Sequence, residues 1–157
     1  MIQGLVVFFW LALCALQDAR QRQIANRLTL GAALLALIYL LWSGTTWLGA
    51  SGGEGLWALG LALLLTLPGY ALGRLGAGDV KMLGALALGS NSTYVLWSLV
   101  GAGGASILWL LASPWLLRHV NHDVRKRLGY LVFDPSKKLP FAPFLWVGFS
   151  LAWFWIH

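Results

Sequence analysis

The chain has 157 residues, of which 59% are hydrophobic and only 10% are charged, and this balance excludes an ordinary soluble domain. Soluble domains carry about 25% charged residues, so this chain has too little charge to cover a water-facing surface of its size. The single cysteine, Cys14, excludes a disulfide framework and a cysteine-rich zinc site. We therefore expect one membrane-embedded domain over residues 1–157.

Stretches without Lys, Arg, Asp or Glu predict the helices in chain order. They cover residues 1–17, 28–53, 55–73, 82–117 and 139–157. The fourth stretch is too long for one span of roughly 20 residues, and the polar run at residues 90–93 predicts a turn inside it. The sequence thus predicts an all-α, polytopic fold of about six transmembrane helices, of which the fourth is short.

All 11 Lys and Arg residues fall in loops that the six-helix arrangement places on one side of the membrane. They follow the first helix, separate the third helix from the fourth, and fill the loop at residues 118–139: Arg20, Arg22, Arg27, Arg74, Lys81, Arg118, Arg125, Lys126, Arg127, Lys137 and Lys138. The positive-inside rule makes this side the cytoplasm and puts both termini on the non-cytoplasmic side. The net charge of +6 is therefore a sign of topology and of contact with lipid headgroups, and we expect no nucleic acid partner.

Two histidines in the basic loop are a weak candidate for a metal site. His119 and His122 lie beside Asp123 with a spacing that can ligate a metal ion on a helix. Histidines in a basic juxtamembrane loop are more often solvated, so we expect no metal and no cofactor.

Two of the five acidic residues are expected at the same face of the membrane. Asp18 ends the first helix on the basic side, and Asp79 lies on that side between the third and fourth helices. The apolar part of the fourth helix, residues 82–89, covers only about 12 Å of a hydrocarbon core of about 30 Å. The helix must therefore begin near Asp79, or the preceding segment must enter the membrane, and ionisable groups at that depth suggest function.

Neighbouring residues leave both structural and chemical roles open for this pair. Gly76 and Gly78 permit backbone angles and close approaches near Asp79 that a side chain would block. Asp18 can pair with Arg22 one turn later, Asp79 can cap its helix, and Lys81 can reach the headgroups or hold the charge of Asp79. Two converging carboxyl groups can also share a proton, so that one activates water while the other polarises a carbonyl and protonates the leaving amine.

Three segments together resemble the type IV prepilin peptidases, polytopic aspartic proteases of prokaryotic inner membranes. Residues 76–81 resemble the GxGD motif of that family, residues 18–26 its first aspartate region, and residues 138–144 the segment entering its last helix. Ala25 departs from the pattern, because the family often has proline there. The resemblance extends over the whole chain and implies Asp18 and Asp79 as the catalytic pair, supported by Gly76, Gly78, Lys81, Asn26 and Pro140.

The resemblance also implies the reaction and the partners. Family members cut the basic leader from prepilins or pseudopilins after a glycine near the cytoplasmic membrane face. Long members carry an insert with two CxxC pairs that binds zinc, and they also N-methylate the mature pilin. This chain lacks the insert and is similar to the short, stand-alone peptidases, including those of Flp/Tad-type pili, so we expect cleavage without methylation. Its oligomeric state stays open.

Two other classes of function stay open on the residues alone. A small transporter or channel would use Asp18 and Asp79 as ion or proton sites in a polar cavity. A structural subunit of a pilus or secretion assembly would use glycines for close helix packing, for which residues 101–105 are suited.

Overall fold

The computed structural model describes residues 1–128 and 140–156, and 83% of these residues are helical. The described ranges contain no β-strand, so the predicted all-α class is confirmed. Lys137 and Lys138 of the basic loop lie outside the described residues. The helices in chain order are α1 (Ile2–Gln21), α2 (Asn26–Ser43), α3 (Gly52–Ala71), α4 (Ala77–Gly89), α5 (Ser92–His119), α6 (His122–Leu128) and α7 (Ala142–Ile156).

Four of these helices, α1, α2, α3 and α5, are long and apolar enough to cross a membrane. The other two predicted helices, α4 and α7, are shorter, with 13 and 15 residues. The fourth helix is short as predicted, and it begins at Ala77, before Asp79. Helix α6 was not predicted, because its seven mostly polar residues carry no apolar pattern.

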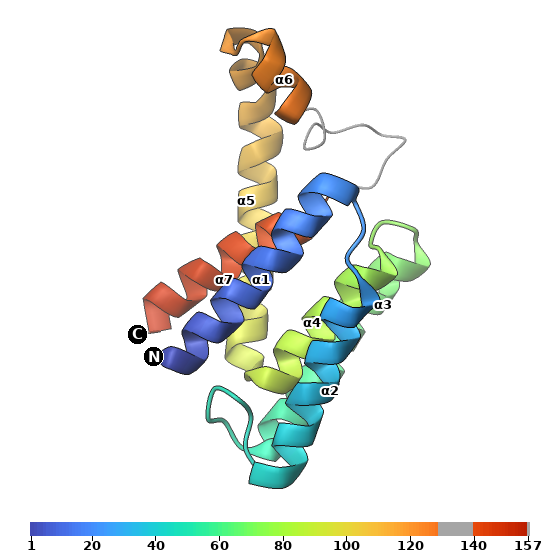
Figure 1. Cartoon of the computed structure of the whole chain (residues 1–157), viewed down its shortest axis with the longest axis vertical. Coiled ribbons are helices and arrows are strands. Elements are labelled where there is room, and N and C mark those ends of the chain that lie inside the picture. The colour runs from blue at the N-terminus through green and yellow to red at the C-terminus, as the bar shows by residue number, and fades with distance from the viewer. Residues whose placement is uncertain (129–139, 157) are drawn as a thin grey trace.

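The helices form two groups, which meet where α5 of one group contacts α3 and α4 of the other (Figure 1). Helix α7 packs against α5 and α1, whereas α4 packs against α2 and α3. Every residue from 82 to 90 is buried, so α4 is the innermost helix of its group. Asp18 on α1 and Asp79 on α4 therefore belong to different groups.

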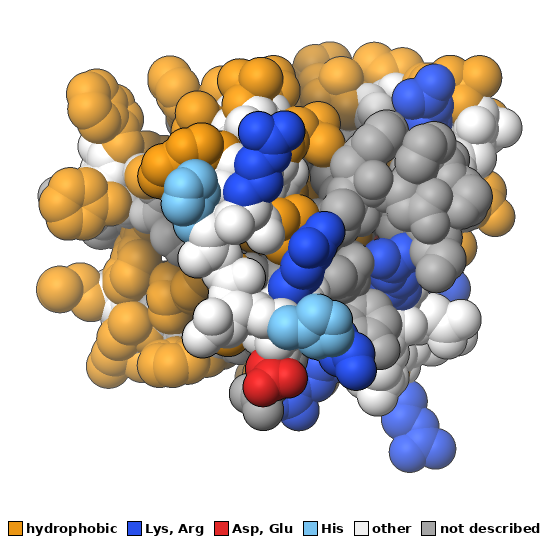
Figure 2. Space-filling view, turned by 90° about the horizontal axis from the view of Figure 1, so that it is seen from above, with side chains coloured by type: hydrophobic (Ala, Val, Ile, Leu, Met, Phe, Trp, Pro, Cys, Tyr) orange, Lys and Arg blue, Asp and Glu red, His pale blue; other side chains and the backbone are white. Residues whose placement is uncertain are grey.

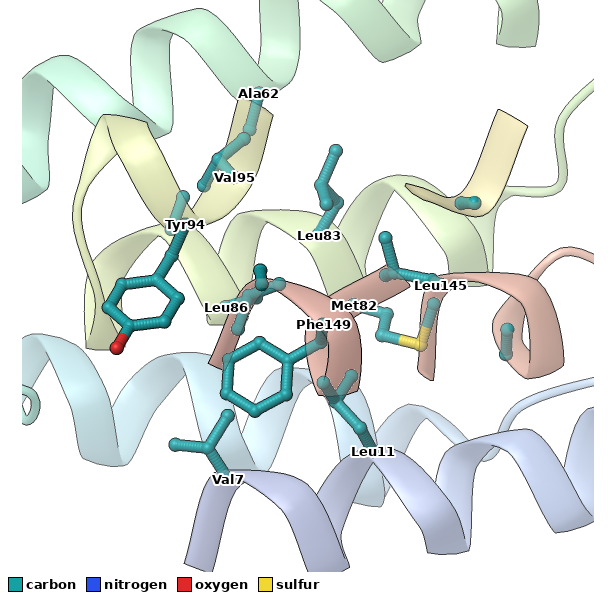
Figure 3. Close-up of a cluster of buried hydrophobic side chains, with 14 of the residues drawn as sticks. Val7, Leu11, Ala62, Met82, Leu83, Leu86, Tyr94, Val95, Leu145 and Phe149 are labelled. Atoms are coloured by element: carbon teal, nitrogen blue, oxygen red, sulfur yellow. The ribbon is translucent and has the colours of Figure 1, made fainter. Parts of the chain in front are cut away.

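A hydrophobic core holds the two groups together (Figure 3). Phe149 and Leu145 of α7 meet Leu11 of α1 and Met82 of α4, and all four side chains are fully buried. The outer surface is apolar as well, which suits contact with lipid tails rather than water. Large exposed side chains on α2 include Leu34, Leu35, Ile38 and Leu41.

Two glycines allow α5 and α7 to cross closely. A Cβ atom added to Gly101 would lie 2.6 Å from the Cα atom of Gly148, and one added to Gly148 would overlap the carbonyl oxygen of Ser98. Gly103 and Gly104 have open space around them instead. The stretch predicted as a packing face therefore packs through Gly101, the buried Ala102 and the partly buried Ala105.

The connections between helices at one end of the bundle carry the basic residues. The end of α1, the connection from α3 to α4 and the end of α5 with α6 lie towards one end of the molecule (Figure 1). Figure 2 shows Lys and Arg side chains gathered over this end. At the other end, the N–H of Leu48 donates to the carbonyl oxygen of Gly89 and joins the α2–α3 connection to the end of α4. The described basic residues thus mark one end, as the six-helix arrangement requires.

Candidate active site

Asp18 lies in the last turn of α1, and its side chain is only 5% exposed. The backbone N–H of Ala142, the first residue of α7, donates to Oδ2 of Asp18 over 3.0 Å. The backbone N–H of Phe141 and the positive charge of Arg22 also stabilise the negative charge of this carboxyl group. A helix N-terminus presents unpaired N–H groups and the positive end of the helix dipole, so it is a suitable anchor for a carboxylate.

Asp79 is the third residue of α4 and is 9% exposed. Its Oδ2 atom accepts a hydrogen bond of 3.0 Å from the backbone N–H of Gly76, which is the N-cap residue of α4. Asp79 is therefore not the N-cap residue itself, but its side chain reaches back to the N-cap amide, as the acidic residue of a capping box does. This contact fixes the direction of the carboxyl group.

Both aspartates line one pocket of about 690 Å³. Its wall consists of the last turn of α1, the loop from α1 to α2, and the start of α4. Most of the side chains along it are polar: Gln17, Asp18, Gln21, Arg22, Gln23, Asn26 and Asp79. The fold thus brings to one pocket two carboxyl groups that are far apart in the sequence, one from α1 and one from α4.

The two glycines of the 76–79 segment differ in what they do. A Cβ atom at Gly76 would lie 3.3 Å from Oδ2 of Asp79, so the missing side chain leaves room for that carboxyl group. A Cβ atom at Gly78 would make only ordinary contact with Ile24, at 3.5 Å. The backbone at Gly76 is ordinary for any residue, with φ −80° and ψ 155°. The predicted close approach therefore occurs at Gly76, beside the Asp79 carboxyl group. The predicted unusual backbone angle occurs at neither Gly76 nor Gly78, and the nearest positive φ is that of Gly73, at +70°.

A family comparison bears on this pocket. The model of the type IV leader peptidase family matches residues 5–116, which include both aspartates and the whole pocket wall. The chain belongs to the type IV leader peptidase family. Family membership makes it a protease, and four of its helices are long and apolar enough to cross a membrane. The match confirms the resemblance over residues 5–116, which contain the first two motif segments, whereas residues 138–144 lie outside it. No curated protein and no solved structure matches the chain.

Three further residues that the motifs of the leader peptidases implied lie close to the pocket. The Nζ atom of Lys81 donates to Oδ1 of Asn26 over 3.0 Å, which joins the start of α4 to the start of α2. Asn26 also lines the pocket. Pro140 is buried and lies two residues before Ala142, the amide partner of Asp18.

Sequence reasoning missed Gln17 as a residue of the leader peptidase pocket, and it named Arg22 only as a possible ion-pair partner of Asp18. Arg22 ends α1 with φ +52°, the only positive φ of a non-glycine residue in the described ranges, and its N–H donates to the carbonyl oxygen of Asp18. Gln17 accepts a hydrogen bond of 2.9 Å from the N–H of Ala25. Arg22 follows Asp18 by four positions, and helical spacing places i and i+4 on one face. That spacing signals Arg22, whereas no local pattern singles out Gln17.

Other chemical groups lie away from the pocket. Cys14 is fully buried in α1. Nδ1 of His119 lies 2.9 Å from the carbonyl oxygen of Trp115, and its ring packs on that indole. No cluster of three His, Cys, Asp or Glu residues that suits a metal ion occurs within residues 1–128 and 140–156.

Proposed function

We propose that this protein is an aspartic endopeptidase that removes the leader peptide from type IV prepilins or pseudopilins, with Asp18 and Asp79 as its catalytic pair. The observation that carries the proposal is the meeting of two buried aspartates in one pocket, in a chain of the type IV leader peptidase family. Acidic residues are scarce in this chain, and a membrane protein keeps ionisable groups at depth mainly for function.

The pair supplies both proton transfers that peptide hydrolysis needs. One carboxylate takes a proton from a water molecule, whose oxygen attacks the carbonyl carbon of the scissile bond. The other carboxyl group, in its acid form, hydrogen-bonds the carbonyl oxygen and stabilises the charge that develops there. Collapse of the tetrahedral intermediate breaks the C–N bond, and a carboxyl group delivers a proton to the leaving amine.

The pocket wall offers groups suited to a peptide substrate. Gln21, Gln23 and Asn26 carry carboxamides, which can donate to and accept from the backbone of an extended peptide. Such contacts recognise the backbone without regard to side chains. We propose that they hold the segment of the substrate around the cleavage site across the two aspartates. We also propose that residues 1–157 form one peptidase domain.

The location follows from the same proposal. We place the basic end of the molecule in the cytoplasm of a prokaryote, with the helices in the inner membrane and anionic headgroups around the basic loop. The pocket then opens near the cytoplasmic surface, where a basic leader remains before cleavage. Since the single cysteine leaves no CxxC pairs, we propose cleavage without N-methylation, as in the short members serving pili or secretion.

Co-expression with a prepilin tests the proposal directly. The size of the prepilin is followed by immunoblot with the wild type and with Asp18→Asn and Asp79→Asn. Both variants should abolish processing, whereas Asp123→Asn, a change at an exposed acidic residue of α6, should leave it intact. Processing at the normal rate by either pocket variant would refute the dyad. An unchanged prepilin with the wild type, together with ion flux in proteoliposomes, would favour the transporter alternative instead.

A further inference from the structure

Two hydrogen bonds meet at the adjacent residues Ala25 and Asn26, and each comes from a different aspartate-bearing helix. The Oε1 atom of Gln17, next to Asp18 on α1, accepts from the N–H of Ala25 over 2.9 Å. The Nζ atom of Lys81, two residues after Asp79 on α4, donates to Oδ1 of Asn26 over 3.0 Å. Residues 25 and 26 therefore link α1 to α4 by polar contacts at the edge of the pocket.

We propose that Gln17, Asn26 and Lys81 are positioning residues, which set the separation of the two aspartates through the start of α2. We call the two hydrogen bonds and the residues that they join the 25–26 tie. The inference rests on the proposed function, because it concerns the geometry of that same reaction. It adds a role for Gln17, which lies outside the motif residues, and a shared role for Asn26 and Lys81.

The packing of the helices explains why such a tie is needed. Helix α1 packs chiefly on α7, while α4 packs on α2 and α3, so each aspartate is held by a different group of helices. The shared hydrophobic core joins the groups through Leu11 and Met82, whereas the pocket wall is mostly polar. Polar contacts therefore join the two groups near the carboxyl groups, and the 25–26 tie acts together with the hydrogen bond of 3.0 Å from Nε1 of Trp10 on α1 to the carbonyl oxygen of Leu28 on α2.

The backbone of Ala25 makes the first hydrogen bond testable by itself. Ala25 is the N-cap residue of α2, with φ −60° and ψ 133°. Proline fixes φ at about −65° and has no N–H, so Ala25→Pro keeps the backbone angle and removes the donor. Gln17→Ala removes the acceptor of the same hydrogen bond and leaves the loop free to move.

The loss of the tie should change turnover more than substrate binding. A displacement of about 1 Å in a catalytic arrangement can cost about 100-fold in rate. We therefore expect Gln17→Ala and Lys81→Met each to lower kcat about tenfold with a KM that changes less than threefold. Lys81→Arg keeps a donor and should restore most of the rate, whereas Gln3→Ala and Lys126→Met, at exposed residues outside the pocket, should match the wild type.

A double-mutant cycle in the full-length protein in detergent, with a prepilin as substrate, decides the matter. In the Ala25→Pro background the hydrogen bond is already absent, so adding Gln17→Ala should cause no further loss of kcat. An equal loss in both backgrounds would show that Gln17 acts elsewhere and would overturn the inference, as would normal kcat for both Gln17→Ala and Lys81→Met. Thermal unfolding of each variant separates loss of fold from loss of position.

The outcome also separates this inference from the proposed function. If Asp18→Asn and Asp79→Asn are inactive while the variants of the 25–26 tie cleave normally, the inference fails and the dyad stands. If the wild type does not cleave prepilin at all, both fail.

Discussion

Substitution of Gly76 by alanine should move the carboxyl group of Asp79 while leaving the stability of the fold nearly unchanged. The new Cβ atom would lie 3.3 Å from Oδ2 of Asp79, a contact tight enough that the carboxyl group must give way by a few tenths of an ångström. The backbone at residue 76 already has angles that alanine adopts freely, so no backbone strain is added. Only the carboxyl group is displaced.

The magnitude follows from that displacement. If 1 Å of misplacement costs about 100-fold in rate, a few tenths of an ångström should cost on the order of fivefold in kcat. The hydrogen bond from the N–H of Gly76 to Asp79 is weakened at a cost of at most about 1 kcal/mol. The reduced freedom of the unfolded chain offsets about 0.4–1 kcal/mol of this, so the free energy of unfolding should hardly change.

The assay compares kcat on a prepilin with the melting temperature for Gly76→Ala and for a matched control. Gly60→Ala on α3 is that control, because a Cβ atom there would have no neighbour within 4 Å. We expect kcat to fall for Gly76→Ala alone and both proteins to melt close to the wild type. A folded Gly76→Ala protein with wild-type kcat would refute the reasoning that this glycine makes room for the Asp79 carboxyl group.

Two further predictions concern the helices around the pocket. Gly148→Ala should destabilise the protein by about 2 kcal/mol or more, because the new methyl group would overlap the carbonyl oxygen of Ser98. Gly103→Ala should be neutral, because a Cβ atom there has open space around it. Thermal unfolding in detergent compares the two variants, and equal melting temperatures would contradict the close crossing of α5 and α7. Cys14 is fully buried, so a maleimide should label it only after the protein is unfolded. Treatment of the folded protein with the maleimide should therefore leave prepilin cleavage intact. Rapid labelling of the folded protein, detected by mass spectrometry, would contradict that burial.

The helices were predictable because their signal is local. The length and hydropathy of each helix can be taken directly from its charge-free stretch. Because the apolar residues 82–89 are too few to span the bilayer, the fourth helix was expected to start before them. The structure places that start at Ala77. The two aspartates were singled out in the same way, since their positions along the chain and the side of each loop follow from the charges.

The partners of those aspartates were not predictable from one sequence. The amide that Asp18 accepts from belongs to Ala142, 124 residues away, and no local pattern connects the two. The hydrogen bond between Gln17 and Ala25 likewise depends on how the loop folds back on α1. Such contacts follow from the tertiary packing of α7 and α2, which the periodicity of a single helix does not encode.

The two short helices give a physical reason for the site. At about 1.5 Å per residue, α4 and α7 are about 20 and 22 Å long, less than a hydrocarbon core of about 30 Å. Helices that short cannot cross the whole core, and a first N–H group that lies away from water needs an acceptor inside the protein. Asp79 accepts from Gly76 at the start of α4, and Asp18 accepts from Ala142 at the start of α7.

Each carboxyl group therefore satisfies an amide that would otherwise be unpaired, and each helix end in turn favours a negative charge beside it. This exchange lowers the cost of keeping an ionised carboxylate in a poorly solvated place. The chain's own backbone thus supplies part of the stabilisation that water gives to an exposed carboxylate. The short length of α4 and α7 thus matters for the chemistry as well as for the fold, because each helix begins where its first N–H groups meet a carboxyl group of the site.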